Sequence, residues 1–117
     1  IIYARLGLAF FIPGYRRYHL PQEYYRIKAN ILKRLGWIEE IFVSELQAEP
    51  WGPEPLIDMP LEEQYRSFNP DLFRQILNFA RSTGFPRFYL WGTEWWFYAR
   101  ETHGVSEFIE IAKELWR

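Results

Sequence analysis

One stretch constrains the fold more than any other, residues 41–52, which read IFVSELQAEPWG. It starts as a run of apolar and β-branched residues, which is typical of a strand buried on both faces. It then reaches Glu45, Gln47 and Glu49 and stops at a Pro-Trp-Gly-Pro turn. In parallel α/β folds, ligands and chemistry gather at the carboxyl ends of strands. The stretch therefore predicts a functional site, provided that the rest of the chain supplies a parallel sheet.

Two strands in the sequence each follow a helix that ends at a glycine. The first helix, expected over roughly 21–35, ends before Gly36 and carries apolar residues at helical spacing: Tyr24, Ile27, Ile31 and Leu35. The second starts at an Asn-Pro-Asp cap and ends before Gly84. We expect strands over roughly 38–46 and 88–91 after these helices. A crossover helix favours parallel pairing, which brings both strand ends to one rim.

The remaining chain completes an alternating order of strands and helices. We expect a strand end within residues 1–11, a loop at 12–19, a turn-rich loop at 51–60, one or two helical turns at 61–66, a loop at 92–104 and a final helix from Ser106. About three βα units with parallel strands indicate the α/β class and a single domain, 1–117. Three strands bury little apolar surface by themselves, so part of a (β/α)8 TIM barrel fits better than a small open sheet.

Composition excludes several classes of function. A net charge of −1, with no long block of one sign, argues against a nucleic-acid partner and against an anionic membrane surface. The absence of cysteine excludes disulfides and leaves the cellular compartment open. No HxH, HExxH or glycine-rich phosphate loop occurs, so we expect neither a metal nor a cofactor. No apolar run approaches the ~20 residues that span a bilayer.

Carboxylates and aromatic side chains gather at the predicted rim. Aromatic residues make up 21% of the chain, with six tryptophans, and a packed core accounts for only part of them. The residues expected at the strand ends are Tyr3, Arg5, Glu45, Gln47, Glu49, Trp51, Trp91, Glu94, Trp95 and Trp96. Paired carboxylates beside aromatic platforms are what glycoside hydrolysis requires.

Each of these residues also has a purely structural interpretation. A glutamate at a strand end is most often solvated, but the apolar run before Glu45 predicts a largely buried position for it. For the pair Trp95 and Trp96 we expect one ring in the core and the other facing the cleft.

Two motifs at this rim resemble a known enzyme superfamily. Residues 43–46, Val-Ser-Glu-Leu, resemble the strand-7 nucleophile motif of the retaining (β/α)8 glycoside hydrolases, the 4/7 superfamily. Residues 89–92, Tyr-Leu-Trp-Gly, resemble its strand 8. The runs 25–30, 44–53, 61–65 and 90–96 together are similar to a bacterial, cellulase-like branch of these barrels, and the resemblance covers nearly the whole chain.

The resemblance implies a role for each rim residue. Glu45 would be the nucleophile that forms a covalent glycosyl-enzyme, with Glu49 as second choice. Tyr3, at the end of strand 6, would hydrogen-bond the nucleophile, and Trp91 would be the platform under the reacting sugar. The other substrate-binding residues would be Arg5, Gln47, Glu49, Trp51, Glu94 and Trp95.

The chain departs from the superfamily in one respect. The acid/base glutamate of the superfamily follows an asparagine at the end of strand 4, and no Asn-Glu pair occurs here. We therefore expect a fragment covering strands 6 to 8, inactive alone, whose partners are an oligo- or polysaccharide and the missing N-terminal part of the barrel. Two alternatives stay open: a non-catalytic carbohydrate-binding or degenerate barrel, and a small α/β domain whose aromatic residues are all core.

Overall fold

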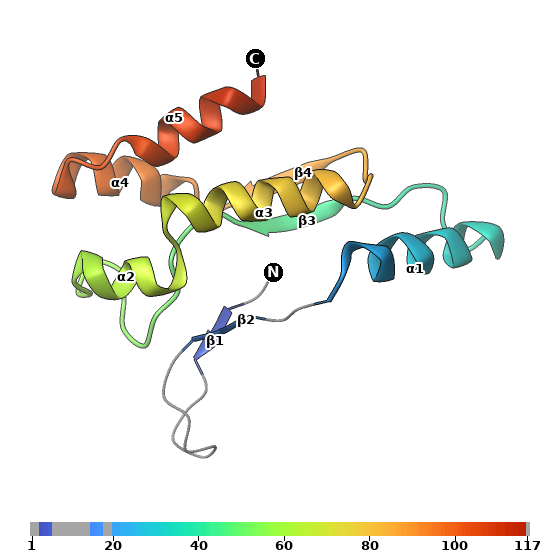
Figure 1. Cartoon of the computed structure of the whole chain (residues 1–117), viewed down its shortest axis with the longest axis horizontal. Coiled ribbons are helices and arrows are strands. Elements are labelled where there is room, and N and C mark those ends of the chain that lie inside the picture. Colours follow the sequence, from blue (N-terminus) through green and yellow to red (C-terminus); the bar gives the residue numbers. More distant parts are fainter. Residues whose placement is uncertain (1–2, 6–14, 18–19, 117) are drawn as a thin grey trace.

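A computed structural model describes residues 3–5, 15–17 and 20–116 (Figure 1). Its elements in chain order are β1 (Tyr3–Arg5), β2 (Tyr15–Arg17), α1 (Gln22–Arg34), β3 (Val43–Gln47), α2 (Leu61–Ser67), α3 (Pro70–Ser82), β4 (Phe88–Trp91), α4 (Glu94–His103), α5 (Glu107–Lys113) and a final 3₁₀ turn, Glu114–Trp116. The mixture of helices with a parallel strand pair confirms the α/β class.

Strands β3 and β4 form a two-stranded parallel sheet, as the sequence predicted. Gln47 pairs with Trp91, and Leu46 pairs with Leu90. An irregularity in register lies between Val43 and Leu46. Helix α3 connects the two strands and covers them, and the parallel direction brings both carboxyl ends to the same rim (Figure 1).

The N-terminal part differs from the expected third parallel strand. Strand β1 pairs with β2 in an antiparallel ladder, Tyr3 opposite Arg17, so the loop expected at 12–19 contains a strand. Among the described residues, neither β1 nor β2 pairs with the β3–β4 sheet. Pro13 and Gly14 favoured a loop at 12–19 in the sequence, although tyrosine is also common in strands. The expectation of three parallel strands is therefore wrong for the described chain.

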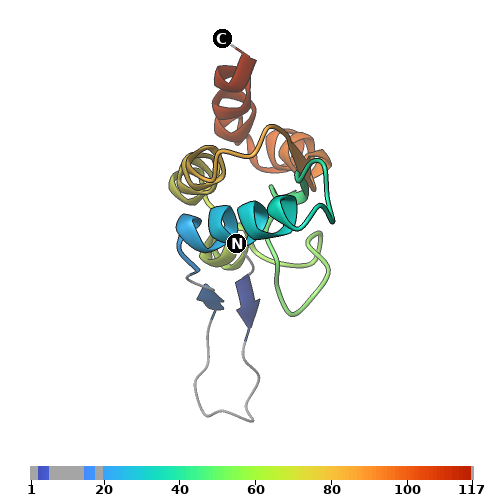
Figure 2. The ribbon, with the colours of Figure 1, turned by 90° about the vertical axis from the view of Figure 1, so that its right-hand side faces the viewer.

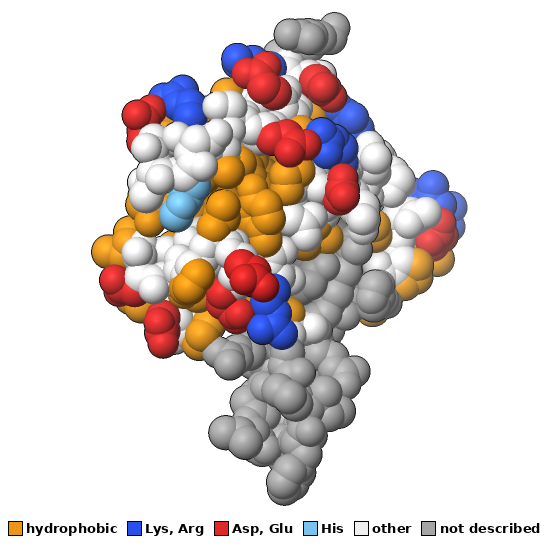
Figure 3. All heavy atoms as spheres, turned by 60° about the vertical axis from the view of Figure 1, so that its left-hand side comes forward, with side chains coloured by type: hydrophobic (Ala, Val, Ile, Leu, Met, Phe, Trp, Pro, Cys, Tyr) orange, Lys and Arg blue, Asp and Glu red, His pale blue; other side chains and the backbone are white. Residues whose placement is uncertain are grey.

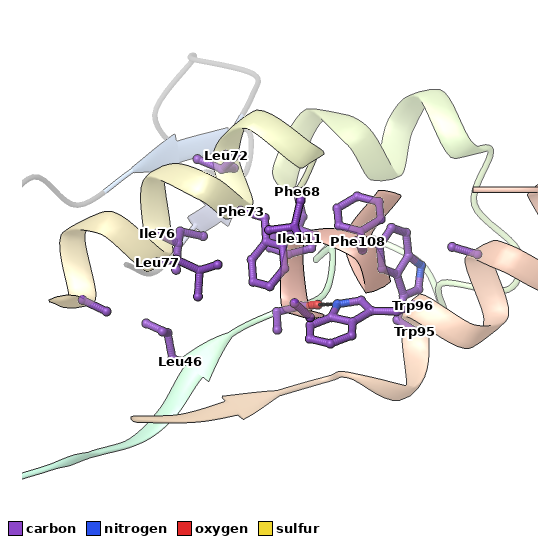
Figure 4. Packing of buried hydrophobic residues seen from close by; sticks show 14 residues of the cluster. Leu46, Phe68, Leu72, Phe73, Ile76, Leu77, Trp95, Trp96, Phe108 and Ile111 are labelled. Atoms are coloured by element: carbon purple, nitrogen blue, oxygen red, sulfur yellow. Dashed lines mark hydrogen bonds between the residues drawn. The ribbon is translucent and has the colours of Figure 1, made fainter. Parts of the chain in front are cut away.

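The core lies on one side of the β3–β4 sheet, between the strands and helices α3, α4 and α5 (Figure 4). Figure 2 shows these three helices away from the β1–β2 pair. Leu46 points from β3 toward Ile76 and Leu77 of α3 (Figure 4). The aromatic centre is Phe68, which is fully buried and stacks on Phe108 at a centroid distance of 5.3 Å and an interplanar angle of 16°. The hydrophobic cluster consists of Leu46, Ala48, Phe68, Leu72, Phe73, Ile76, Leu77, Ala80, Trp95, Trp96, Ala99, Phe108, Ile111 and Ala112.

Helix α3 forms as its sequence predicts. The side chain of Asn69 accepts a hydrogen bond from the Leu72 backbone N–H at 3.0 Å, and Pro70 occupies the first turn, where no backbone donor is needed. The expected apolar stripe is buried along its whole length: Leu72, Phe73, Ile76, Leu77 and Ala80. This stripe is what holds the helix against the sheet.

Helix α4 occupies a region that the sequence predicted as loop, residues 92–104. Aromatic residues are weak helix formers, and the motif at its start read as a strand end. Trp95, Trp96 and Ala99 lie at helical spacing and are all buried, so tertiary packing decides the conformation. Gly104 ends the helix in the left-handed region with φ of 70°.

Helix α1 is present, but its apolar stripe faces outward. Ile27 and Ile31 are 59% and 52% exposed, and Ala29 is the only buried residue of the helix. The helix therefore lies beside α3 without adding its main apolar face to the core. No helix among the described residues is both long enough and apolar enough to cross a membrane.

The surface over α2, α4 and α5 mixes apolar and charged side chains. Figure 3 shows hydrophobic side chains exposed between acidic and basic ones on this face. Arg74 links α3 to α5 through an ion pair with Glu107 at 2.9 Å. No broad field of one sign covers the face seen there, in keeping with the net charge of −1.

Candidate functional site

In the described part of the chain, one face of the β3–β4 sheet has no helix over it and carries the exposed rings of Phe42, Tyr89 and Trp91. Side chains alternate along a strand, so when Phe88 and Leu90 turn toward the helices, Tyr89 and Trp91 turn away from them. Tyr89 is 52% exposed and packs edge-on against Phe42, with ring centroids 5.8 Å apart. This face, which we call the open face, leads to the rim where both strands end.

Two half-exposed tryptophans lie where the open face meets the rim. Trp51 and Trp91 have ring centroids 5.7 Å apart and an interplanar angle of 83°, with exposed fractions of 39% and 42%. The backbone N–H of Ala48 donates to the Trp91 carbonyl at 2.8 Å, which extends the pairing to the end of both strands. The two rings form a right-angled corner with aromatic surface open to solvent.

Two carboxylates lie at the same rim. Glu49 packs against Gly92, the residue that follows β4, and Glu94 begins α4. Burial raises the pKa of Glu49, and the negative charge of Glu94 raises it further. The structure thus brings together Glu49, Glu94, Trp51 and Trp91, as the sequence predicted from the two strand ends.

Gly92 allows this close approach, and its replacement tests it. Its φ is 85°, and a Cβ atom there would lie 2.6 Å from the Cβ of Glu49. We expect Gly92→Ala to lower the free energy of unfolding by the cost of the left-handed conformation, about 1–2 kcal/mol, plus about 1–3 kcal/mol for overpacking. Urea unfolding measures the total loss of unfolding free energy. Gly104→Ala is the matched control, because its φ is 70° and nothing lies within 4 Å of its Cβ position. Equal losses in the two variants would contradict the packing of Glu49 on Gly92.

The raised pKa of Glu49 makes a prediction about stability and pH. The folded state binds the Glu49 proton more tightly than the unfolded state, so the protonated carboxyl adds to the free energy of unfolding at low pH. This stabilisation is lost as pH rises through the raised pKa of Glu49. Glu49→Gln is therefore expected to stabilise the chain near neutral pH and to have no effect below the ordinary carboxyl range. Urea unfolding at both pH values checks this, with Glu54→Gln in the exposed 51–60 loop as control. An equal gain at both pH values would show that ionisation is not its cause.

Glu45 lies differently from its predicted position. Its side chain is exposed instead of largely buried, and so is that of Ser44. Both residues lie in the register irregularity of β3, which interrupts the alternation that would turn one of them inward. Among the described residues, no hydrogen bond or ion pair reaches the Glu45 carboxylate. The side chains of Tyr3 and Arg5, which the sequence places near it, lie outside the described part.

Two predicted substrate-binding residues are structural. Trp95 is 3% exposed and donates from Nε1 to Gln64, so the expectation that one ring of the Trp95-Trp96 pair faces the cleft is wrong. Trp96 is also buried and donates from Nε1 to the Ala48 carbonyl at 2.7 Å (Figure 4). Gln47 is 7% exposed and donates to the Glu49 carbonyl at 3.0 Å. Helix formation at α4 carries both rings inward, which the loop assignment did not foresee.

Sequence reasoning missed two polar residues behind the corner. Gln64 and Ser67 of α2 are fully buried and hydrogen-bonded, and they lie three residues apart on one helical face. Their spacing continues the inward face that begins at Leu61, which is partly buried against the core. That spacing could have predicted that both side chains are buried, but the sequence predicted only one or two helical turns at 61–66.

The site contains groups suited to holding a polar ring-shaped ligand. Carboxylates accept hydrogen bonds from hydroxyls, and aromatic faces stack on the C–H faces of a sugar. No cluster of three or more metal-ligating side chains occurs in the described part of the chain. No protein-family model, curated protein or solved structure matches this chain.

Proposed function

We propose that this chain supplies the nucleophile-bearing part of a retaining glycoside hydrolase that acts on a β-linked glycan. One observation carries the proposal. The parallel pairing of β3 and β4 brings the carboxylate-bearing end of one strand beside the tryptophan-bearing end of the other, and Trp51 and Trp91 stay open to solvent there. Carboxylates next to an exposed aromatic corner are the elements that glycoside hydrolysis uses.

Within this proposal Glu45 attacks the anomeric carbon, and Glu49 is the second choice. Burial and the negative charge of Glu94 raise the pKa of Glu49, which disfavours its carboxylate form, so we assign Glu49 to hydrogen bonding with the substrate. Glu94 and Arg5 would bind sugar hydroxyls, and Tyr3 would orient Glu45. The general acid comes from outside this chain, because the chain has no Asn-Glu pair.

The proposal includes a larger barrel of which β3 and β4 are neighbouring strands. A groove of about 590 Å³ beside β4 supports this, and its walls are mostly apolar residues of the strand and of α3, α4 and α5. They include Phe88, Leu90, Trp96, Ile109 and Leu115. A further strand along β4 would cover the groove and satisfy the free strand edge.

The angle between the two tryptophans bears on the substrate. Successive rings of a flat β-linked chain lie nearly parallel, so two platforms for successive sugars should be parallel as well. Trp51 and Trp91 are almost perpendicular and only 5.7 Å apart. The corner therefore suits a single pyranose that stacks on one ring and touches the other.

A second candidate function is carbohydrate binding without hydrolysis. The observation in its favour is the exposed Glu45, which no described residue orients. The third hypothesis, an α/β domain whose aromatic residues are all core, requires Trp51, Trp91 and Trp95 to be buried. Trp95 is buried, but Trp51 and Trp91 are about two-fifths exposed.

Covalent capture tests the proposal in the chain as it stands. A 2,4-dinitrophenyl 2-deoxy-2-fluoro-β-glucoside needs no general acid, because its leaving group departs as a stable phenolate. The carboxylate oxygen of Glu45 bonds to the anomeric carbon as the bond to dinitrophenolate breaks, leaving a glycosyl ester. The fluorine slows hydrolysis of this ester by destabilising the positively charged transition state.

Intact-mass spectrometry detects the ester, and fragmentation locates it. Labelling of Glu45 supports the proposal, and labelling of Glu49 alone moves the nucleophile there. No label, together with tryptophan-fluorescence evidence of glucoside binding, replaces the proposal with the binding function. Neither label nor binding rejects both.

A further inference from the structure

We infer that Ser67 and Gln64 are positioning residues that hold Trp51 at a right angle to Trp91. The hydrogen bonds that carry this inference do not depend on any function. Its consequence for sugar binding rests on the function proposed above. Both residues lie on α2, behind the rim, and neither has any exposed surface.

Ser67 contacts the tryptophan backbone directly. Its Oγ accepts a hydrogen bond from the Trp51 N–H at 2.9 Å and donates one to the Gln64 carbonyl at 3.1 Å. A hydroxyl that both accepts and donates is held in one rotamer. The backbone position of Trp51 is therefore tied to a rigid helix across 16 residues of sequence.

Gln64 ties the rest of the 51–60 loop to the same helix. Its Nε2 donates to the carbonyls of Leu56 at 2.9 Å and Met59 at 2.8 Å, which lie further along that loop. Its Oε1 accepts from Trp95 Nε1 at 2.7 Å, which connects the loop to α4. No buried side-chain polar atom in the described part lacks a partner, so the network is fully satisfied.

Trp51 needs such a support because its ring is poorly held by packing. The ring is 39% exposed, and among the described residues its aromatic contact is the perpendicular Trp91. The Met59 side chain packs where a Cβ of Gly52 would lie, next to Trp51. Gln64 holds the Met59 carbonyl, so it also fixes this packing contact of the loop. We therefore assign the fixed angle of the tryptophan corner to α2 more than to the rings themselves.

Two near-perpendicular indoles this close couple their electronic transitions, which gives a paired positive and negative band in circular dichroism. The band of the Trp51–Trp91 pair is the difference between the spectrum of the chain and that of Trp51→Phe. We expect Ser67→Ala to lose most of this difference band while keeping its helix signal. Affinity for a methyl β-glucoside should fall about tenfold, the equivalent of about 1.4 kcal/mol.

Ser82→Ala is the matched control. Ser82 Oγ also donates to the carbonyl three residues earlier, at 2.7 Å, but it lies at the exposed end of α3. The difference band of Ser82→Ala should therefore stay unchanged.

The outcomes separate this inference from the proposed function. An unchanged band in Ser67→Ala overturns the inference, and so does equal loss in Ser82→Ala, which would indicate general loosening. A band lost only in Ser67→Ala, in a chain that binds no glucoside at all, supports the positioning role and counts against the proposed function.

Discussion

Phe108→Ala is expected to lower the free energy of unfolding by about 3–5 kcal/mol, the range for removing a large aromatic side chain from a packed core. Phe108 has no exposed surface, and its ring contacts four other aromatic rings, with the Trp95 centroid 4.8 Å away. The ring attaches α5 to α2, α3 and α4 at once. Urea unfolding followed by tryptophan fluorescence measures the loss.

The control for this prediction is the same substitution on an exposed ring. Phe97 on α4 is 52% exposed, so Phe97→Ala should cost under about 1 kcal/mol. If Phe108→Ala leaves no folded chain, Phe108→Leu provides a smaller, measurable loss. Losses of similar size in Phe108→Ala and Phe97→Ala would show that the aromatic cluster is not the centre of the core.

Glu45→Gln is expected to abolish covalent capture of the dinitrophenyl fluoroglucoside. The glutamine side chain has nearly the same shape as glutamate but is neutral, and its amide is a very weak nucleophile. Because Glu45 is exposed and no described residue bonds to its carboxylate, the stability of the fold should not change. Intact-mass spectrometry over a time course measures the rate, and urea unfolding checks the fold.

Glu49→Gln is the matched comparison. It makes the same change four positions later, next to Gly92, and should slow capture at Glu45 without abolishing it, because Glu49 is assigned to substrate binding. Capture that survives Glu45→Gln and disappears with Glu49→Gln would assign the nucleophile to Glu49. Loss of capture in both variants would mean that the two carboxylates act together.

Local signals in the sequence predicted much of this fold. The Asn69 cap and the stripe from Leu72 to Ala80 predicted α3 and its buried face correctly. Gly36 and Gly84 end helices where expected, both with positive φ. The apolar runs that follow these helices predicted the parallel pair, but one face of both strands is exposed instead of buried. Each signal acts over a few residues and agrees with the tertiary packing.

The wrong predictions for α4 and α1 have physical causes that act between residues distant in sequence. Helix α4 forms because its tryptophans pack on Phe68 and Phe73, residues distant in sequence, and aromatic residues have little helix preference of their own. The stripe on α1 has the period of a buried helix face, but burial needs a partner surface. Periodicity shows which face is apolar, and it does not show what covers that face.

For the site, the sequence predicted correctly which residues lie close together. It predicted less well which of them are exposed. It brought Glu49, Trp51, Trp91 and Glu94 to one rim through parallel pairing. It misjudged Glu45, because a break in strand register is invisible in the pattern of residue types. It also missed Ser67, whose role is set by the backbone of Trp51.

The outward stripe of α1 matters most while the protein is being made. Ribosomes release a chain from its N-terminus, so Ile27 and Ile31 emerge before any residue of the main cluster. That cluster starts at Leu46 and is incomplete without Phe108 and Ile111. The apolar stripe of α1 therefore reaches the solvent before this core is complete, and completion of the core leaves the stripe uncovered. Ile27 and Ile31 thus present apolar surface both before and after the core forms, and such surface exposes a nascent chain to unwanted association.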